Sequence, residues 1–175
     1  MMQTRIAGDI MIPLEKYPHI PYWFTLRQAV AEMEKTSLEV GGRKSLPRAL
    51  LVFDEKYNLL GIVRRRDILR GLEPKFLRTM SMPYRKKLFD VEIDPNLADM
   101  STDKVAEAMQ EQAEQAVSEV MQPIAATVDI DDHLAKIIYK MVSRDLNLLP
   151  VMKDDQVVGV VRSVDVFHEV ANTLL

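Results

Sequence analysis

One block of the sequence occurs twice, and this internal repeat limits the possible folds more than any other feature. Each copy opens with an apolar residue, Met, one further residue and Pro, as Ile10-Met11-Ile12-Pro13 and as Val120-Met121-Gln122-Pro123. Each then has apolar residues at helical spacing: Leu26, Ala29, Val30 and Met33 in the first copy, and Leu134, Ile137, Ile138 and Met141 in the second. Self-similarity of this kind indicates one structural unit used twice.

Two short apolar runs around a charged turn follow in each copy. Residues 49–53 and 59–63 flank one turn, and residues 148–152 and 157–161 flank the other, which predicts a β-hairpin in each copy. A second helix should begin near Asp67 and near Asp165. The order strand, helix, strand, strand, helix predicts a mixed α/β (α+β) fold with repeats at residues 5–72 and 116–173. Thr25 and Asp132 are the expected N-caps of the first helices.

A single copy cannot cover both faces of its three-stranded sheet and therefore needs a partner. The other copy supplies one, so we expect a single body with pseudo-twofold symmetry. Residues 73–115 form an insertion between the copies. Within it, residues 103–116 are strong helix formers and predict a surface helix, whereas Pro83 should interrupt any helix around it. Residues 41–48, with two Gly and three basic residues, are expected to form a flexible loop.

The end of each copy resembles the CBS domain, a family named after cystathionine β-synthase. That family's repeat closes with Gly, two apolar residues, usually Thr or Ser, two variable residues, then Asp and two apolar residues. Residues 61–69 and 159–167 follow this order except at the Thr or Ser, and Leu149-Pro150-Val151 and both opening Met-x-Pro segments also fit. The resemblance covers both copies and leaves out the insertion.

The resemblance implies a regulatory module. Paired CBS domains form a disc-like body, commonly dimerise, and in many cases bind AMP, ADP, ATP or S-adenosylmethionine between the repeats. In similar proteins the closing Asp holds the ribose hydroxyls, the Thr or Ser helps to hold phosphate, and apolar strand residues enclose the adenine. By position, the resemblance assigns the ribose contact to Asp67 and Asp165. It assigns the adenine contact to four strand residues: Ile12, Val52, Ile124 and Val151.

The sequence departs from the nucleotide-binding pattern at the phosphate position. Arg64 and Arg162 replace the Thr or Ser, and Ser163 lies one residue too late. The position before Leu-Pro-Val, which is basic in some AMP-binding members, is apolar in both copies, as Ala49 and Leu148.

Three interpretations of these residues stay open. An arginine pairs bidentately with phosphate, so Arg64 and Arg162 could provide a different phosphate contact. Each arginine could equally pair with Asp67 or Asp165 and close the site. The two aspartates could also be ordinary residues at helix starts, stabilised by capping and by the helix dipole.

We expect no enzymatic activity, and therefore no catalytic residue. The chain has no Cys, no Ser-His-Asp arrangement and only six Gly, none in a phosphate-cradling loop. Asp129, Asp131, Asp132 and His133 suggest a metal site, but a strand exit followed by a helix cap explains them better, because hard cations need more oxygen ligands. No metal site and no essential cofactor are expected, and the regulatory ligand would be an adenine nucleotide or S-adenosylmethionine.

Charge is distributed unevenly along the chain. Residues 43–87 contain thirteen Lys or Arg and four Asp or Glu, whereas residues 88–119 contain nine acidic residues and one Lys. The basic part lacks the interleaved aromatic residues of single-strand binders, so we expect solvated faces and no nucleic acid partner. No run is apolar for long enough to span a bilayer or to act as a signal peptide, and we expect no membrane association and a cytoplasmic location.

Two functions fit these features. The first is a regulatory module that binds an adenosine-containing ligand between the repeats and acts on an unknown protein partner. The second is a ligand-free dimeric scaffold whose insertion binds other proteins. A homodimer built from the helices of both repeats is expected in either case, since a small domain cannot cover every apolar helix face.

Overall fold

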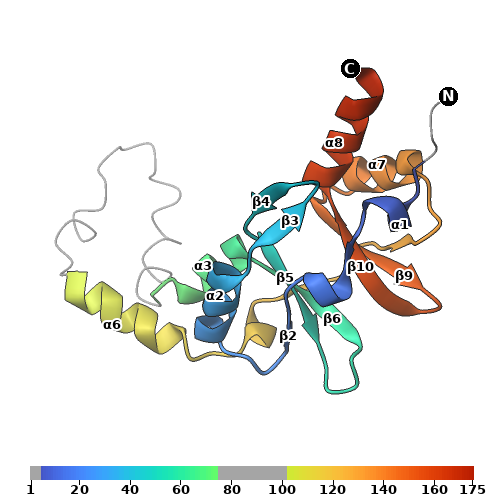
Figure 1. Cartoon of the computed structure of the whole chain (residues 1–175). Coiled ribbons are helices and arrows are strands. Elements are labelled where there is room, and N and C mark those ends of the chain that lie inside the picture. The colour runs from blue at the N-terminus through green and yellow to red at the C-terminus, as the bar shows by residue number, and fades with distance from the viewer. Residues whose placement is uncertain (1–4, 75–101) are drawn as a thin grey trace.

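The computed structural model describes residues 5–74 and 102–175 (Figure 1). Two four-stranded mixed sheets form its centre, with strand orders β2-β5-β6-β7 and β1-β10-β9-β8. Helices cover one face of each sheet, and the other two faces share a third apolar cluster. The predicted mixed fold of two β-α-β-β-α repeats is confirmed.

The first repeat contains these elements: α1 (Ala7–Ile10), β1 (Ile12–Pro13), the 3-10 helix η1 (Leu14–Lys16), β2 (His19–Pro21), α2 (Leu26–Lys35), β3 (Leu38–Val40), β4 (Arg43–Ser45), β5 (Ala49–Phe53), β6 (Leu59–Arg64) and α3 (Arg65–Leu72). The remaining elements are α6 (Thr102–Gln112), the 3-10 helix η3 (Val117–Glu119), β7 (Gln122–Pro123), β8 (Val128–Asp129), α7 (Leu134–Ser143), β9 (Leu148–Lys153), β10 (Gln156–Arg162) and α8 (Ser163–Leu174). The predicted hairpins correspond to β5–β6 and β9–β10, which are antiparallel pairs.

The opening strand of each repeat belongs to the sheet of the other repeat. β1 pairs with β10, with Ile12 opposite Val160, and β7 pairs with β6, with Ile62 opposite Gln122. A Cβ atom on Gly159 would lie 2.5 Å from the carbonyl oxygen of Ile12, so only glycine allows this approach. The exchange makes each sheet four-stranded, where the sequence predicted three strands, and joins the two repeats through backbone hydrogen bonds.

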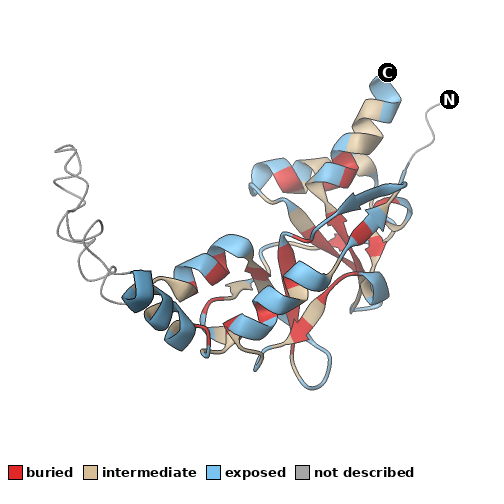
Figure 2. Ribbon diagram, turned by 60° about the vertical axis from the view of Figure 1, so that its left-hand side comes forward, coloured by how far each residue is buried: buried red, intermediate tan, exposed pale blue. Residues whose placement is uncertain are grey.

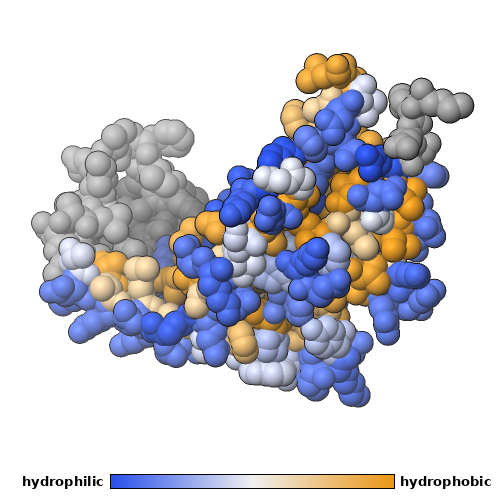
Figure 3. All heavy atoms as spheres, viewed as in Figure 1, coloured by the Kyte–Doolittle hydropathy of each residue, from blue (hydrophilic) through white to orange (hydrophobic). Residues whose placement is uncertain are grey.

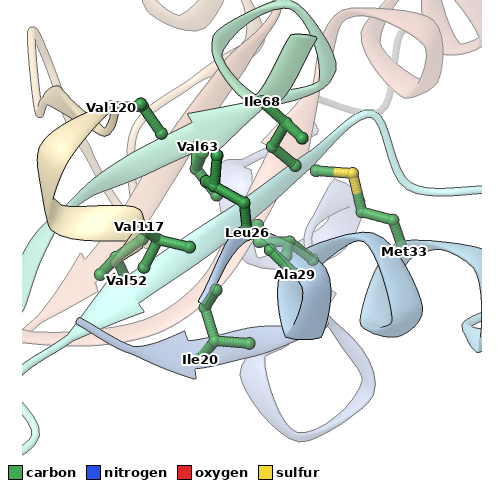
Figure 4. Packing of buried hydrophobic residues seen from close by; sticks show 10 residues of the cluster. Ile20, Leu26, Ala29, Met33, Val52, Val63, Ile68, Val117 and Val120 are labelled. Atoms are coloured by element: carbon green, nitrogen blue, oxygen red, sulfur yellow. The ribbon is translucent and has the colours of Figure 1, made fainter. Parts of the chain in front are cut away.

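Three buried clusters result from this arrangement. Helices α2 and α3 cover the first sheet, with Leu26, Val52 and Ile68 in its core (Figure 4). Helices α1, α7 and α8 contribute to a second core around Ile137. The third cluster lies between the sheets and includes Leu51, whose side chain leaves the strand on the opposite side from that of Val52. Figure 2 shows the buried residues along the strands and on the inner helix faces.

Two local expectations were wrong. Residues 41–48 do not form a loop throughout: β3 and β4 make an antiparallel hairpin, and its turn residues Gly41 and Gly42 have φ of 57° and 76°. Two consecutive positive φ values are what a two-residue hairpin turn requires. Asp132 does not cap α7. Its carboxylate accepts hydrogen bonds from the Asp129 amide and the Lys136 ammonium, and His133 is the N-cap residue.

Two further local expectations, the Thr25 cap and the helix in the insertion, agree with the structure. Thr25 caps α2 as predicted, since its side chain accepts a hydrogen bond from the Gln28 amide. The helix predicted within the insertion is α6, which ends at Gln112 and is exposed along most of its length (Figure 2). The expectation about Pro83 falls outside the described residues.

Candidate functional site

An arginine and an aspartate pair at the same place in both repeats, where β6 meets α3 and where β10 meets α8. Arg64 is the N-cap residue of α3, and Asp67 lies three residues later in its first turn. Arg162 and Asp165 have the same relation in α8. Asp67 and Asp165 are the only charged residues that are buried among those described, with 0% and 6% of their surface exposed. Buried carboxylates need partners, because an unpaired charge is costly away from water.

Asp67 has many partners. Its Oδ2 accepts hydrogen bonds from the Arg64 backbone amide and from Arg64 Nε, both at 2.9 Å. Its Oδ1 accepts from Arg64 Nη2 at 3.0 Å and from Arg70 Nη2 at 3.1 Å. The fifth donor is Gln122 Nε2 at 3.2 Å, which belongs to β7 and therefore to the opening of the second repeat. The Asp67 carboxylate thus ties both repeats to the start of α3.

These contacts change the pKa of Asp67. Burial raises the pKa of the carboxyl group, but the side-chain and backbone hydrogen bonds from Arg64 and the charges of Arg64 and Arg70 outweigh burial and hold this pKa below its ordinary value. Asp67 is therefore ionised at neutral pH, and its two oxygens are already occupied by donors from the chain.

Asp165 has fewer partners. Its Oδ2 accepts from Arg162 Nε at 2.7 Å, and its Oδ1 accepts from Arg162 Nη2 at 2.9 Å. Arg162 uses its remaining terminal nitrogen, Nη1, to donate to Ser45 Oγ at 3.0 Å, across 117 residues of sequence. The side chain of Arg162 is 13% exposed, whereas that of Arg64 is 44% exposed. The second pair is therefore enclosed more fully, although its carboxylate has fewer donors.

The four expected adenine contacts lie in four different environments. Val52 and Val151 are fully buried, in the cores of the first and second repeat. Ile12 is 5% exposed and lies in the cluster between the sheets. Ile124 is partly exposed and follows β7. The structure does not bring these four side chains together in one cluster, and their contact with a ligand stays a prediction.

Tyr17 is a buried polar residue that no sequence pattern singles out. Its hydroxyl donates to the carbonyl oxygen of Ala49 at 2.6 Å. Burial raises the pKa of Tyr17 well above its ordinary value, and the positive charge of Arg162 offsets part of this effect. The neutral phenol therefore lies between the sheets, within the electrostatic influence of the second pair.

Ser45 and Gln122 were also missed, because neither stands near its partner in sequence. Gln122 is the variable residue of an opening Met-x-Pro segment, and only the exchange of β7 into the first sheet brings it to Asp67. Ser45 belongs to the segment that was expected to be a loop. Neither position carries a pattern that sequence reasoning could have used.

The acidic segment before α7 forms a turn. Asp129 accepts a hydrogen bond from the Asp131 amide, and Asp132 is bonded to Asp129 and Lys136 as described above. The lysine and these hydrogen bonds hold the pKa of Asp132 below its ordinary value, although burial acts in the opposite direction and is the largest single influence. Across residues 5–74 and 102–175, no three acidic or His side chains are grouped so that they could hold a metal ion.

Two α+β repeats that exchange opening strands and carry matching Arg–Asp pairs define a tandem-repeat module. The model of the CBS domain matches residues 7–74 and 117–172, and the chain belongs to the CBS domain family. A search of the curated proteins finds no match to this sequence. In the part of the chain that the structure describes, no helix is both long and apolar enough to cross a bilayer.

Solved structures with the same fold include three that are similar over almost the whole chain. A CBS domain-containing protein from Bacillus anthracis has a TM-score of 0.65 and 18% identity, with 99% of this chain and 96% of that chain covered. A putative acetoin utilization protein (AcuB) from Vibrio cholerae has a TM-score of 0.63 and 20% identity, with 98% and 94% covered. CBSX2, solved in complex with AMP, has a TM-score of 0.62 and 15% identity, with 96% and 97% covered. Identities this low establish the shared fold alone.

Proposed function

We propose that the protein is a regulatory module that binds an adenosine-containing ligand between its repeats and transmits the binding to a partner. The observation that carries this proposal is the Arg–Asp pair with a buried carboxylate, which is repeated at β6–α3 and β10–α8. A duplicated ion pair at the helix start fits a ligand that has both a diol and an anionic group. The AMP complex of CBSX2 supports an adenosine compound as the ligand class.

The chemistry of the pair explains why both ligand groups are needed. The carboxylate can accept hydrogen bonds from both vicinal hydroxyls of a ribose, and the guanidinium can pair with a phosphate or carboxylate. A ligand that supplies both groups gives each ion a new partner when the pair opens. A ligand with only the ribose leaves the arginine without a partner for its charge, and an uncompensated buried charge is costly. Nucleotides, and S-adenosylmethionine through its carboxylate, meet this requirement.

Asp165 and Arg162 should dominate ligand binding. Asp67 is held by five donors from three residues, and a ligand would have to displace several of them at once. Asp165 is held through Arg162 alone in the described structure, so the departure of this one guanidinium frees the carboxylate. The second repeat also contains the Leu149-Pro150-Val151 segment, which fits the family more closely than the equivalent residues of the first repeat.

No reaction is proposed for this module. The alternative function is a ligand-free dimeric scaffold, and one observation favours it: both arginines already occupy the aspartates that a ribose would use.

A thermal-shift panel distinguishes the two functions. The panel contains AMP, ADP, ATP, S-adenosylmethionine and adenosine, and adenosine is the matched control because it has the ribose but no anionic group. At a free concentration of 100 times its dissociation constant, a ligand that binds only the folded state adds about 2.7 kcal/mol to the free energy of unfolding. We expect at least one anionic compound to raise the melting temperature clearly more than adenosine does. Equal melting temperatures with all five compounds would favour the scaffold.

A further inference from the structure

The β3–β4 hairpin has no counterpart in the second repeat. Thirteen residues separate α2 from β5, whereas four residues separate α7 from β9. The hairpin is fastened by Leu38, which is 2% exposed and packs in the cluster between the sheets, with Val40 beside it. Arg43, Lys44 and Ser45 of β4 are exposed. One strand of the hairpin is thus anchored in the core, and the other lies at the surface.

The exposed strand contacts the second Arg–Asp pair. Ser45 Oγ accepts a hydrogen bond from Arg162 Nη1 at 3.0 Å, while Nε and Nη2 of the same guanidinium are on Asp165. Figure 1 shows the hairpin extending from the first repeat towards the start of α8. All three nitrogens of Arg162 are therefore engaged, and the third partner comes from the other repeat.

The first pair is held differently. Gln122 and Arg70 bond directly to the carboxylate of Asp67, and the side chain of Arg64 stays 44% exposed. In the second pair the extra contact is made to the arginine instead, and that arginine is only 13% exposed. The two pairs thus differ in which member the other repeat restrains.

We propose that the β3–β4 hairpin is a latch on the second-repeat site, and that Ser45 is the positioning residue that keeps Arg162 on Asp165 when no ligand is bound. This inference rests on the proposed function and names how its site is regulated. Opening the latch frees Nη1, the guanidinium then leaves Asp165, and the carboxylate becomes available to a ribose. The site would bind ligand only after two segments from different repeats separate.

The physical properties of the hairpin allow such opening. The exposed strand β4 pairs with β3 and joins neither large sheet, and a two-stranded hairpin gains little stability from its own pairing. Arg43 and Lys44 stand beside Ser45 and are exposed, so an approaching anion is attracted to the strand that must move. Glu39 lies opposite Lys44 in the hairpin register. The anionic group of the ligand would both draw the latch outwards and receive Arg162.

Ser45→Ala tests the latch, and Ser45→Thr is its matched control because threonine keeps the hydroxyl. The first readout needs no ligand: it is the exchange rate of the Arg162 Nε proton by NMR, with the signal assigned by its loss in Arg162→Lys. Because Ser45 is exposed, its hydrogen bond has only the ordinary net value of an intramolecular bond, which changes such an opening equilibrium about fivefold to tenfold. We expect Ser45→Ala to speed the exchange by that factor and Ser45→Thr to exchange like the wild type.

The second readout is calorimetry with AMP on three proteins: the wild type, Ser45→Ala and Ser45→Thr. Ser45→Ala should bind AMP about fivefold more tightly than the wild type, since less free energy is needed to open the pair. Unchanged exchange in Ser45→Ala would overturn the positioning role of Ser45. Faster exchange with unchanged or weaker AMP affinity would overturn the latch. Absence of AMP binding in all three proteins would count against the proposed function itself. The exchange rates would still show whether Ser45 holds Arg162 on Asp165.

Discussion

Asp67 and Asp165 occupy matching positions, yet different numbers of donors hold their carboxylates. Asp67 accepts five hydrogen bonds and is fully buried, while Asp165 accepts two, both from Arg162. Breaking a buried ion pair from one side is far more damaging than the net value of the pair suggests, because the remaining group loses its partner. At the residue scale, Asp67 is therefore expected to act mainly in stability and Asp165 mainly in binding.

Asp67→Ala should lower the free energy of unfolding by about 3 kcal/mol, the lower end of the range for a broken buried pair. This end is appropriate because Arg64 and Arg70 are about half exposed and can regain water when the carboxylate is removed. Urea denaturation followed by circular dichroism measures the change. Asp131→Ala, at an exposed aspartate, is the control and should stay within about 0.5 kcal/mol of the wild type. Equal losses in the two variants would contradict the role assigned to Asp67.

The raised pKa of the buried Tyr17 phenol leads us to expect a loss of stability at alkaline pH. In the unfolded chain a tyrosine ionises near pH 10, but the buried phenol keeps its proton to a higher pH. Below pH 10 both states are protonated and the contribution of Tyr17 is intact. As the pH rises above 10, the unfolded state loses a proton that the folded state retains, so the free energy of unfolding falls by up to about 1.4 kcal/mol per pH unit.

Tyr17→Phe isolates this effect. At pH 7 the variant should be less stable by about 1 kcal/mol, because it lacks the hydrogen bond to Ala49. Since phenylalanine does not ionise, the gap to the wild type should shrink between pH 9 and pH 11. Urea denaturation at the three pH values measures it. A gap that stays constant would show that Tyr17 ionises normally.

Part of the site was predictable from sequence at this scale. The spacing of three residues between Arg64 and Asp67, and between Arg162 and Asp165, suggested that each arginine could close its own aspartate. The structure shows this contact in both repeats. Ser45 and Gln122 were not predictable, because each reaches its partner from the other repeat. Local spacing identifies contacts within one turn of helix and gives no information about contacts across the fold.

At the element scale, the exchange of β1 and β7 shows what the closing glycines of the repeat do. Gly61 and Gly159 each lie where a foreign strand crosses, and a side chain at either position would meet the backbone of that strand. The hairpins and helices were predictable from apolar periodicity, because that signal lies within each element. The exchange was not, because strands of two residues carry too little pattern to select a partner. The β3–β4 hairpin was missed because Gly41-Gly42 was taken as a sign of flexibility instead of a tight turn.

The insertion at residues 73–115 is attached to the first repeat by hydrogen bonds at its C-terminal end. The amides of Leu26 and Arg27 donate to the carbonyl oxygens of Gln115 and Ala113, both at 3.0 Å. Gln115 Nε2 also donates to the carbonyl oxygen of Gly71 at 2.8 Å. These contacts satisfy amides at the start of α2 that have no partner within the helix. The end of the insertion therefore supports the first repeat.

We expect two replacements with Gly/Ser linkers to differ. Replacing residues 75–101 should leave a cooperative thermal melt. Extending the replacement to residue 115 should remove the contacts at α2 and α3 and lower the free energy of unfolding by about 2 kcal/mol. Each lost hydrogen bond contributes roughly 1 kcal/mol, and hydrogen bonds to water recover part of the loss. Equal melting temperatures for the two replacements would contradict the supporting role of residues 113–115.

At the scale of the whole molecule, exposed apolar residues gather on the helices of the second repeat. The side chains with more than half their surface exposed there are Tyr139, Val142, Val164, Phe167 and Leu174. Figure 3 shows apolar atoms at the end of α8. Leu69 on α3 is 66% exposed and extends this feature to the first repeat. Uncovered apolar helix faces of this kind are typical of interaction surfaces, which supports the predicted homodimer.

Light scattering after size exclusion tests the dimer. At micromolar concentration the wild type should have about twice the 20.0 kDa mass of one chain. Phe167→Glu should shift the mass to the monomer, because dimer formation would bury a new charge. Met109→Glu, on the exposed helix α6, is the control and should remain dimeric. A wild-type mass of 20 kDa would end this prediction.

The whole fold was predicted more fully than the site. In a duplicated sequence, the elements predicted for one repeat apply to the other repeat as well. The packing of the two sheets against each other then follows from the need to bury their apolar faces. The site depends on features that the shared repeat pattern does not predict: an extra hairpin in the first copy, a glutamine in β7 and, in both copies, an arginine at the usual Thr or Ser position. The pseudo-twofold body is therefore symmetric in architecture and asymmetric around its two Arg–Asp pairs.

Calorimetry with AMP on the wild type, Asp165→Ala and Asp131→Ala tests the central claim most directly. Charge-assisted hydrogen bonds contribute roughly 1.5–3 kcal/mol, so Asp165→Ala should weaken binding about ten- to a hundredfold. Asp131→Ala, which removes an exposed carboxylate from the same repeat, should bind like the wild type. Circular dichroism of Asp165→Ala confirms that the variant is folded before it is titrated. An AMP affinity that Asp165→Ala leaves unchanged would contradict the assignment of the ligand site to the Arg162–Asp165 pair.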